Sequence, residues 1–319
     1  MKVVITGRVP TAAVDMLSAH HEVSSWDSET LVSREELLQR VAGADAIVSL
    51  LTERVDAELL DAAGPQVRVV ANVAVGFNNI DLAACRERNV VATNTPGVLT
   101  DATADIAMAL ILMSTRRLGE GERVIRSGTP WQWGMFYMLG TGIQGRRLGI
   151  VGMGQIGAAL ARRAAAFGMT IAYSNRNPIS DELAAELGCV RLDMDELLIT
   201  SDVVSLHCPY SSATHHLIGA AELSQMRSDA FLINTARGPV VDEAALADAL
   251  REGQIAGAGL DVFENEPAVN LGLLELDNVV LIPHLGSATI ETRTAMATLA
   301  AKNVIAVLRG ESAPTPITS

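Results

Sequence analysis

The stretch Leu148-Gly149-Ile150-Val151-Gly152-Met153-Gly154-Gln155-Ile156-Gly157 decides the fold of this 319-residue chain. An apolar run, three glycines spaced GxGxxG and the helical pattern of Ala158 to Phe167 follow in the order of a dinucleotide-binding strand, turn and helix. In such a unit Gly152 permits the tight turn, Gly154 lets the backbone approach a pyrophosphate, and Gly157 lets helix and strand pack closely. The alternative is a structural strand-to-helix turn whose glycines are incidental.

The next apolar run, Ile171 to Tyr173, leads into Ser174-Asn175-Arg176. A site for NAD usually places Asp or Glu here to bind the ribose hydroxyls, yet no acidic residue occurs between Gly168 and Ser180. A guanidinium can instead pair with the 2′-phosphate of NADPH. The sequence therefore predicts NADPH as the preferred cofactor and NADH as a weaker one. The alternative is that Arg176 is an ordinary solvated loop residue.

Short apolar runs recur along the chain, separated mostly by segments of helical length. Runs without strict alternation indicate strands buried on both faces, as in parallel sheets covered by helices. Ten strands in one sheet would be unusual, so we predict two sheets of about five strands each. The ten runs are Val3–Ile5, Ala46–Val48, Val67–Val70, Val90–Val91, Leu148–Val151, Ile171–Tyr173, Val203–Leu206, Phe231–Ile233, Leu260–Phe263 and Val279–Ile282.

Two helices indicate how the domains are joined. Pro96-Gly97 breaks the first set of runs, and Asp101 to Asp105 then open a long helix with acidic residues in its first turns. A last helix, from about Ile290 to Leu308, follows the final strand and is expected to pack on the first domain. The fold class predicted is α/β, with two doubly wound parallel-sheet domains and the active site in the cleft between them. The tail Ala313 to Pro316 is expected to fray.

Composition narrows the class of protein. Apolar residues make up 49% and charged residues 19% of the chain, as in globular proteins. The 24 basic and 37 acidic residues give a net charge of −13, which disfavours nucleic acids and anionic membranes as partners. The three cysteines, Cys85, Cys189 and Cys208, form no CxxC pair, so neither a disulfide nor a metal site is predicted. The sequence shows no signal peptide, and we expect a cytoplasmic protein.

Arg237, Glu266 and His284 each follow one of the last apolar runs. The ligand crevice of an open α/β sheet lies beyond the carboxyl ends of its strands, so all three are expected on the same rim as the Gly152 loop. Arginine can bind a carboxylate and polarise an adjacent carbonyl, histidine can protonate a developing alkoxide, and glutamate can fix the imidazole. Singly each has an ordinary surface, turn or core explanation. Together they predict acid–base catalysis beside a nicotinamide.

Other residues near the expected crevice are assigned to cofactor binding. Cys208 ends a strand over the expected cofactor ring, and Thr103 lies near a helix start that faces the cleft. We predict no nucleophilic role for Cys208, because hydride transfer needs no covalent intermediate. The full set of predicted cofactor contacts is Thr103, Gly152, Gly154, Gln155, Ile156, Gly157, Ser174, Asn175, Arg176, Cys208, Pro209, Thr214, Thr235, Ala236, Asp261 and Gly286.

These motifs resemble those of the D-isomer-specific 2-hydroxyacid dehydrogenases. The resemblance covers nearly the whole chain in order. It implies that Arg237, Glu266 and His284 are the catalytic residues and that the backbone amides around Val75 and Gly76 help to bind the substrate carboxylate. It also implies a flavodoxin-like substrate domain, residues 1–98 plus 287–319, and a Rossmann coenzyme domain, residues 99–286. The motifs that carry it are Asn72–Asp81, Gly152–Gly157, Asn234–Gly238, Asp261–Pro267 and Pro283–Thr289.

Within the family, Asn175-Arg176 and Leu50 to Asp56 look most like the NADPH-using glyoxylate and hydroxypyruvate reductases. In that subgroup an aromatic residue just before the coenzyme domain can reach the partner subunit's substrate pocket. Trp133 is the matching candidate, although the proline that commonly follows soon after it is missing here. The alternative for Trp131 and Trp133 is packing in a dimer interface. The resemblance implies a homodimer through the coenzyme domains and substrate contacts from Leu51, Val75, Gly76, Trp133, Arg237 and His284.

Rival functions come from the same family resemblance. One is an NAD(P)-sensing, corepressor-like binding protein, which we disfavour because little sequence lies outside the two expected domains. A phosphoglycerate or D-lactate type of dehydrogenase is a second rival. The phosphoglycerate type is less favoured, since no regulatory domain follows Leu308 and no acidic NAD residue is seen. A formate type is disfavoured because Glu266 stands where that group lacks a carboxylate.

Overall fold

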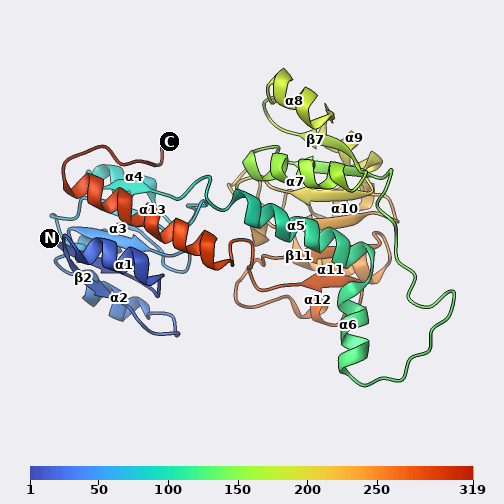
Figure 1. Ribbon diagram of the computed structural model, residues 1–319, viewed down its shortest axis with the longest axis horizontal. Helices are drawn as coiled ribbons and strands as arrows, with labels where there is room; N and C mark the ends of the chain where they lie inside the picture. The colour runs from blue at the N-terminus through green and yellow to red at the C-terminus, as the bar shows by residue number, and fades with distance from the viewer. Residues whose placement is uncertain (319) are drawn as a thin grey trace. The chain divides into compact units, whose positions relative to one another are not determined.

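The computed structural model describes residues 1–318, which divide into two compact units (Figure 1). Unit 1 comprises Met1–Leu99 and the chain from Ala288 onward, and unit 2 comprises Thr100–Ser287. Each boundary lies one residue from the one expected from the sequence. Both units are built on a sheet whose neighbouring strands are all parallel and whose faces are covered by helices. The prediction of two parallel-sheet α/β domains is confirmed, with seven strands instead of about five in the second sheet.

Unit 1 contains a five-stranded sheet in the order β2-β1-β3-β4-β5. Alternate residues of each strand enter opposite cores, as Val69 and Val70 of β4 do, because successive side chains of a strand point to opposite faces. One core is formed with α1 and α13, the other with α2, α3 and α4. The elements are β1 (Lys2–Ile5), α1 (Thr11–Ser18), β2 (Glu22–Ser25), α2 (Arg34–Val41), β3 (Ala46–Ser49), α3 (Ala57–Ala63), β4 (Val69–Asn72), α4 (Leu82–Glu87), β5 (Val91–Thr93) and α13 (Ile290–Leu308).

Unit 2 contains a seven-stranded sheet in the order β12-β11-β10-β9-β6-β7-β8. Helices α5 and α7 pack on one face, and α9, α10 and α11 pack on the other. The elements are α5 (Thr100–Thr115), α6 (Leu118–Arg126), β6 (Arg147–Val151), α7 (Gln155–Ala166), β7 (Thr170–Ser174), α8 (Asp181–Leu187), β8 (Cys189–Arg191), α9 (Met194–Thr200), β9 (Val203–Leu206), α10 (Ala220–Gln225), β10 (Phe231–Asn234), the 3₁₀ turn Gly238–Val240, α11 (Glu243–Arg251), β11 (Gly257–Leu260), α12 (Leu271–Leu274) and β12 (Val279–Leu281).

Most helices begin where a short polar side chain caps the first turn. The side chain of Asp56 accepts a hydrogen bond from the Leu59 amide at the start of α3, and Asp242 accepts one from Ala245 at the start of α11. Such caps satisfy amides that have no partner inside the helix. Helix α7 differs, because Gly154 at its N-cap has no side chain to do this. The first amides of α7 therefore remain available to a ligand.

Three expectations about secondary structure were wrong. Strands β2 and β8 were not predicted, because these edge strands are mostly exposed and lack an apolar run. Strand β11 lies at Gly257–Leu260, three residues before the predicted run Leu260–Phe263, because its small residues let α5 pack closely: a Cβ on Gly259 would lie 3.0 Å from that of Leu110. The tail is bound rather than frayed, since the Thr315 amide donates to Asn303 (2.9 Å) and the Ile317 amide to the Ala92 carbonyl (2.9 Å).

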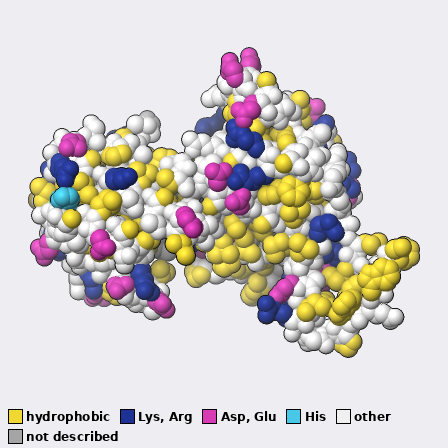
Figure 2. All heavy atoms as spheres, viewed as in Figure 1, with side chains coloured by type: hydrophobic (Ala, Val, Ile, Leu, Met, Phe, Trp, Pro, Cys, Tyr) yellow, Lys and Arg dark blue, Asp and Glu magenta, His cyan; other side chains and the backbone are white. Residues whose placement is uncertain are grey.

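The segment between α6 and β6 protrudes from unit 2 as a long loop (Figure 1). Large apolar side chains gather on it and on α6 (Figure 2), and Trp133 is 75% and Phe136 86% exposed. Helix α6 buries none of its own residues. We call this the apolar arm; its exposed large side chains are Leu118, Ile125, Trp131, Trp133, Met135, Phe136, Tyr137 and Leu139. In residues 1–318 no helix is both long and apolar enough to cross a membrane.

Candidate active site

The carboxyl ends of six strands in unit 2 form one row. Val151 of β6 pairs with Ser174 of β7 and Leu206 of β9, and the row continues through Asn234, Leu260 and Leu281 of β10, β11 and β12. The loops that follow these strands therefore leave the sheet at one edge. This places the glycine loop, Arg237, Glu266 and His284 on the same rim, as predicted.

The glycine loop has the shape that a dinucleotide needs. Gly152 has φ +97°, and a Cβ there would lie 2.6 Å from the Cys208 amide nitrogen; a Cβ on Gly157 would lie 2.7 Å from the Gly152 carbonyl oxygen. A Cβ on Gly154 would meet nothing within 4 Å. The turn is thus closed on its inner side and open at the start of α7, where unpaired amides and the helix dipole favour a phosphate. These residues fit a dinucleotide cofactor.

The turn after β7 is joined to the glycine loop. The Gly152 amide donates to the Ser174 carbonyl (3.0 Å), and the Met153 amide donates to Asn175 Oδ1 (2.6 Å). The side-chain amide of Asn175 therefore stands where a carboxylate would bind ribose hydroxyls in an NAD site. Arg176 follows it, with its side chain exposed. Ser174 and Asn175 are thus hydrogen-bonded to the Gly152 loop, and Arg176 is the next residue of the same turn.

His284 and Glu266 form a contact pair. The imidazole Nδ1 lies 2.8 Å from Glu266 Oε2, and Glu266 Oε1 accepts a hydrogen bond from the Phe263 amide (3.0 Å). Burial raises the pKa of Glu266, but the hydrogen bonds from His284 and Phe263 and the charges of His284 and Arg237 outweigh it, so its pKa lies below the usual range. The carboxylate is therefore ionised at neutral pH and holds one imidazole nitrogen, which leaves Nε2 for a substrate.

The backbone of His284 is fixed by Asp261. His284 has φ +52°, a left-handed conformation that costs a non-glycine residue about 1–3 kcal/mol. Its amide donates to the Asp261 carbonyl (2.9 Å), and the Asp261 carboxylate accepts from the amides of Leu285 and Gly286. Thr103 Oγ1 in turn donates to the Gly286 carbonyl (3.1 Å). Asp261, Thr103 and Gly286, predicted as cofactor contacts, thus form the support of the histidine loop.

Arg237 sits in a turn organised by Asn234. The Asn234 side chain accepts from the Ala236 amide (3.0 Å) and donates to the Arg237 carbonyl (2.9 Å), while Arg237 Nη1 donates to the Ala236 carbonyl (2.7 Å). Burial lowers the pKa of the guanidinium, and the charge of Glu266 opposes that shift. Arginine nonetheless remains protonated in proteins. The rim therefore holds a half-buried fixed positive charge within electrostatic reach of the Glu266–His284 pair.

The loop after β9 lies against Gly152. Burial raises the pKa of the Cys208 thiol, which disfavours the thiolate and agrees with its having no nucleophilic role. Thr214 Oγ1 donates to the Pro209 carbonyl (2.9 Å) and accepts from the Ser211 amide (2.8 Å), which closes this loop. Thr235 Oγ1, at the end of β10, is buried with no hydrogen-bond partner among residues 1–318. This buried hydroxyl is therefore available to form a hydrogen bond with a ligand at the rim.

In unit 1, two loops follow β3 and β4. Asn72 Nδ2 donates to the Gly76 carbonyl (3.0 Å) and Asn94 Nδ2 to the Val75 carbonyl (2.8 Å), whereas neither the Val75 nor the Gly76 amide donates a hydrogen bond within residues 1–318. Two adjacent amides whose carbonyls are fixed by side-chain hydrogen bonds can bind an anion. Leu51 lies in the other loop, which Asn79 Nδ2 fixes by donating to the carbonyls of Leu50 and Glu53 (both 3.0 Å).

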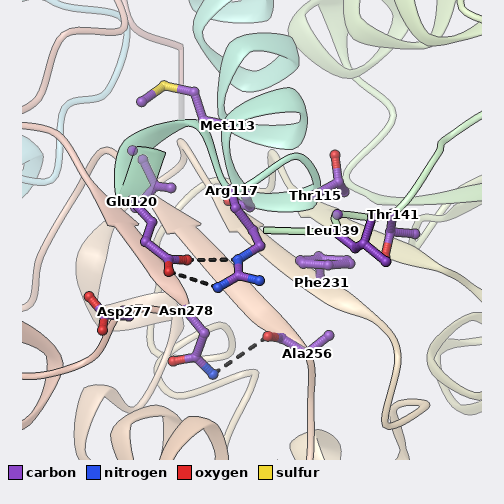
Figure 3. Close-up of a pocket in the computed structure, with 14 residues that line it drawn as sticks. Met113, Thr115, Arg117, Glu120, Leu139, Thr141, Phe231, Ala256, Asp277 and Asn278 are labelled. Carbon is purple, nitrogen blue, oxygen red and sulfur yellow. Dashed lines mark hydrogen bonds and ion pairs between the residues drawn. The ribbon is translucent and has the colours of Figure 1, made fainter. Parts of the chain in front are cut away.

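A cavity of about 320 Å³ lies elsewhere in unit 2 (Figure 3). It is lined by the end of α5, the base of the apolar arm and residues at the amino ends of β10 to β12, including Phe231, Ala256 and Asn278. The Arg117–Glu120 ion pair lies across it (2.7 Å). Because it faces the amino ends of the strands, this cavity is separate from the candidate active site. Trp133 makes no ring contact with another described residue and is not brought to the rim within the chain.

Three asparagines and one arginine organise these loops but were given no individual role in the sequence analysis. They are Asn72, Asn79, Asn234 and Arg191, whose side chains bind backbone groups. Asn72 and Asn234 are each the last residue of a strand, and a buried polar residue at a strand end is a signal that the sequence already contains. Nothing in the local sequence marks Arg191.

Comparison with known proteins identifies the family. Residues 108–286 match the sequence profile of the D-isomer specific 2-hydroxyacid dehydrogenase, NAD binding domain. A glyoxylate reductase from Thermococcus onnurineus is 49% identical, with 98% of this chain and 95% of that protein covered. The TT0316 protein of Thermus thermophilus superposes with a TM-score of 0.93 at 43% identity, with all of both chains covered.

A third relative carries ligands. It is an NADPH-dependent glyoxylate/hydroxypyruvate reductase from Sinorhizobium meliloti, solved with NADP and malonate, at 34% identity and a TM-score of 0.85, covering 99% of this chain and 96% of that one. The likeness to these relatives extends along the full chain. The chain belongs to the D-isomer specific 2-hydroxyacid dehydrogenase family and is an NAD(P)-dependent oxidoreductase.

Proposed function

We propose that this protein reduces small 2-keto acids, glyoxylate and hydroxypyruvate, to 2-hydroxy acids with NADPH. The observation that carries the proposal is the contact of His284 Nδ1 with Glu266 (2.8 Å) on the rim that also holds the glycine loop and Arg237. Relatives named glyoxylate reductase along the whole chain support the choice of substrate. A bound reduced nicotinamide would supply the hydride for the keto carbon.

The residues of the chain would supply binding and the proton. Arg237 binds the substrate carboxylate and polarises the neighbouring carbonyl, since its charge is fixed and its donors are planar. His284 donates a proton from Nε2 to the oxygen as the carbonyl becomes an alcohol, so one hydride and one proton are consumed per turnover. Glu266 keeps the imidazole oriented and stabilises its protonated form. The free amides of Val75 and Gly76 can bind a substrate carboxylate, so unit 1 is proposed as the substrate domain and unit 2 as the coenzyme domain.

A substrate panel tests the activity. Purified protein is mixed with NADPH or NADH and glyoxylate, hydroxypyruvate, pyruvate or a bulkier keto acid, and cofactor oxidation is followed by absorbance. We expect turnover with the two small keto acids, and at least ~100-fold less in His284→Gln with NADPH affinity unchanged. Loss of NADPH binding in that variant would overturn the assigned role. Binding of NADPH without turnover of any keto acid would favour the corepressor-like alternative. A preference for bulkier keto acids would favour a different type of dehydrogenase.

The NADPH preference is proposed from Ser174, Asn175 and Arg176. A neutral Asn175 that accepts from the glycine loop leaves no carboxylate to repel a 2′-phosphate, and Arg176 adds positive charge. Arg176→Ala should therefore raise the KM for NADPH about tenfold or more, while the KM for NADH changes little. Equal KM values for the two cofactors in the native protein would refute this assignment.

We propose that the apolar arm binds a second copy of the chain and forms a homodimer through the coenzyme domains. An exposed apolar surface of this size is a typical protein interface. Sedimentation at equilibrium should give a dimer that dissociates in Trp133→Ser/Phe136→Ser and persists in Leu271→Ser, which removes an equally exposed apolar residue of α12. A monomeric native protein would contradict the proposal. If Trp133→Ala remains dimeric, an increase in the KM for hydroxypyruvate without a change in the KM for NADPH would support a contact of Trp133 with the partner's substrate pocket.

We also propose a cytoplasmic location, because the three cysteines of the sequence form no disulfide pattern.

A further inference from the structure

Arg191 lies at the end of the edge strand β8, beside the proposed cofactor turn. Strand β8 pairs with β7, and Arg191 is opposite Tyr173, one residue before Ser174. Its Nη2 donates hydrogen bonds to two successive carbonyls of the turn, those of Asn175 (3.0 Å) and Arg176 (3.2 Å). One guanidinium from a neighbouring strand thus holds the backbone of both residues.

The turn is therefore fixed from two sides. On one side Asn175 Oδ1 accepts the Met153 amide of the glycine loop (2.6 Å), and on the other Arg191 binds the carbonyls. Without Arg191, the negative ends of two carbonyl dipoles would face the space beside Arg176 uncompensated. A phosphate would be repelled by those oxygens and attracted by the guanidinium that covers them.

The acidic side chains that flank β8 in the sequence form contacts with groups other than Arg191. Asp193 accepts the Glu196 amide at the start of α9 (2.8 Å), and Glu186 of α8 pairs with Arg162 (2.7 Å). No ion pair of Arg191 occurs in residues 1–318, whereas Arg162 and Arg163 of the neighbouring helix are both paired. Arg176 and Arg191 thus place two positive charges at the carboxyl end of adjacent strands.

We propose that Arg191 determines cofactor specificity together with Arg176: it holds the Asn175–Arg176 turn in place and adds a second positive charge to the site of the 2′-phosphate. The inference rests on the NADPH preference proposed above. It assigns to an edge strand that carries no sequence motif a part in choosing between NADPH and NADH.

The test compares ligands that differ only in the 2′-phosphate. Calorimetric titration of the full chain with 2′,5′-ADP and with 5′-AMP measures the contribution of that phosphate without turnover. We expect Arg191→Ala to weaken 2′,5′-ADP binding about tenfold and 5′-AMP binding less than twofold, and to raise the KM for NADPH but not for NADH. Arg191→Lys, which keeps the charge but not the planar donors, should fall between. Arg162→Ala, an exposed arginine of α7, is the control and should change neither.

Two outcomes overturn the inference and one overturns its basis. Equal weakening of both nucleotides by Arg191→Ala would show that the residue only shapes the turn, and no weakening of either would show that it has no part in the site. Either result overturns the inference if Arg176→Ala lowers the affinity for 2′,5′-ADP more than the affinity for 5′-AMP. If Arg176→Ala has no selective effect, the proposed NADPH preference itself fails. Far-ultraviolet circular dichroism of each variant confirms that the fold is kept.

Discussion

Replacing Glu266 by glutamine removes a charge next to His284 while keeping the size of the side chain. Two unit charges 2.8 Å apart interact with about 1.5 kcal/mol in a water-like dielectric and about 6 kcal/mol at an effective dielectric of 20. Both side chains are about one-third exposed (32% and 36%), so the lower part of this range applies. Hydrogen bonds to charged groups contribute about 1.5–3 kcal/mol. We take about 2 kcal/mol, or roughly a 30-fold loss of kcat/KM.

The same variant should change the pH profile in a defined direction. The pKa of Glu266 lies below its ordinary value of 4.5, so the carboxylate is fully ionised well above that pH and takes up a proton only as the pH falls through the lowered value. Activity of the native protein should therefore persist to below about pH 4.5 as far as this group is concerned. Glu266→Gln has no carboxyl group at this position to take up a proton, so its rate should show no fall in that acid range.

The assay is initial-rate reduction of glyoxylate from about pH 3 to 8, with deuterated NADPH to verify that hydride transfer limits the rate. Glu264→Gln is the matched control, because Glu264 belongs to the same turn but accepts the Glu243 amide (2.8 Å) instead of contacting His284. NADPH affinity should be unchanged in both variants. A kcat/KM within threefold of the native value, together with an acid limb that is still present in Glu266→Gln, would refute the reasoning.

Three further predictions concern the loops around the site. Gly154→Ala should change the free energy of unfolding by no more than about 1 kcal/mol, because its Cβ meets nothing within 4 Å, but it should weaken NADPH binding at least tenfold. Gly238→Ala should lower the free energy of unfolding by about 3 kcal/mol or more, since its Cβ would lie 1.9 Å from the Phe263 carbonyl carbon. Urea unfolding and NADPH titration distinguish the two, and equal effects would be contrary to the geometry. Asn79→Asp removes the donor to two carbonyls, so it should lower the free energy of unfolding by about 2–3 kcal/mol and raise the KM for glyoxylate, with no change in NADPH affinity. An unaltered urea midpoint together with an unaltered KM would exclude a role for Asn79 in the Leu51 loop. Cys208→Ser should keep at least half of the native kcat, and loss of most activity with an intact fold would show that the thiol takes part.

Much of the candidate site could be predicted from the sequence. The glycine spacing and the runs that precede Arg237, Glu266 and His284 were sufficient to place them on one rim, because parallel strands of similar length end at one edge of their sheet. The structure confirms the common edge through the row from Ser174 to Leu281. It also shows the expected contact between His284 and Glu266, which lie 18 positions apart in the chain, and identifies Nδ1 as the nitrogen that makes it.

The exposure of the apolar arm could not be predicted from the sequence. Its tryptophans are conspicuous in the sequence, but only the structure shows that α6 and the loop after it leave these large side chains outside the chain's own cores. An apolar run predicts burial without saying against what.

The sequence by itself determined the two parallel sheets, the dinucleotide loop and the identity of the candidate reactive side chains, because hydrophobic periodicity and glycine spacing are local properties of the chain. Only the tertiary structure decided the edge strands β2 and β8, the early position of β11 and the bound tail. It also decided which distant groups support the site: Asp261 under the His284 loop, Asn234 inside the arginine turn and Arg191 across from Asn175. These depend on which strands become neighbours and on hydrogen bonds between residues far apart in the chain, and both are fixed only when the sheet assembles.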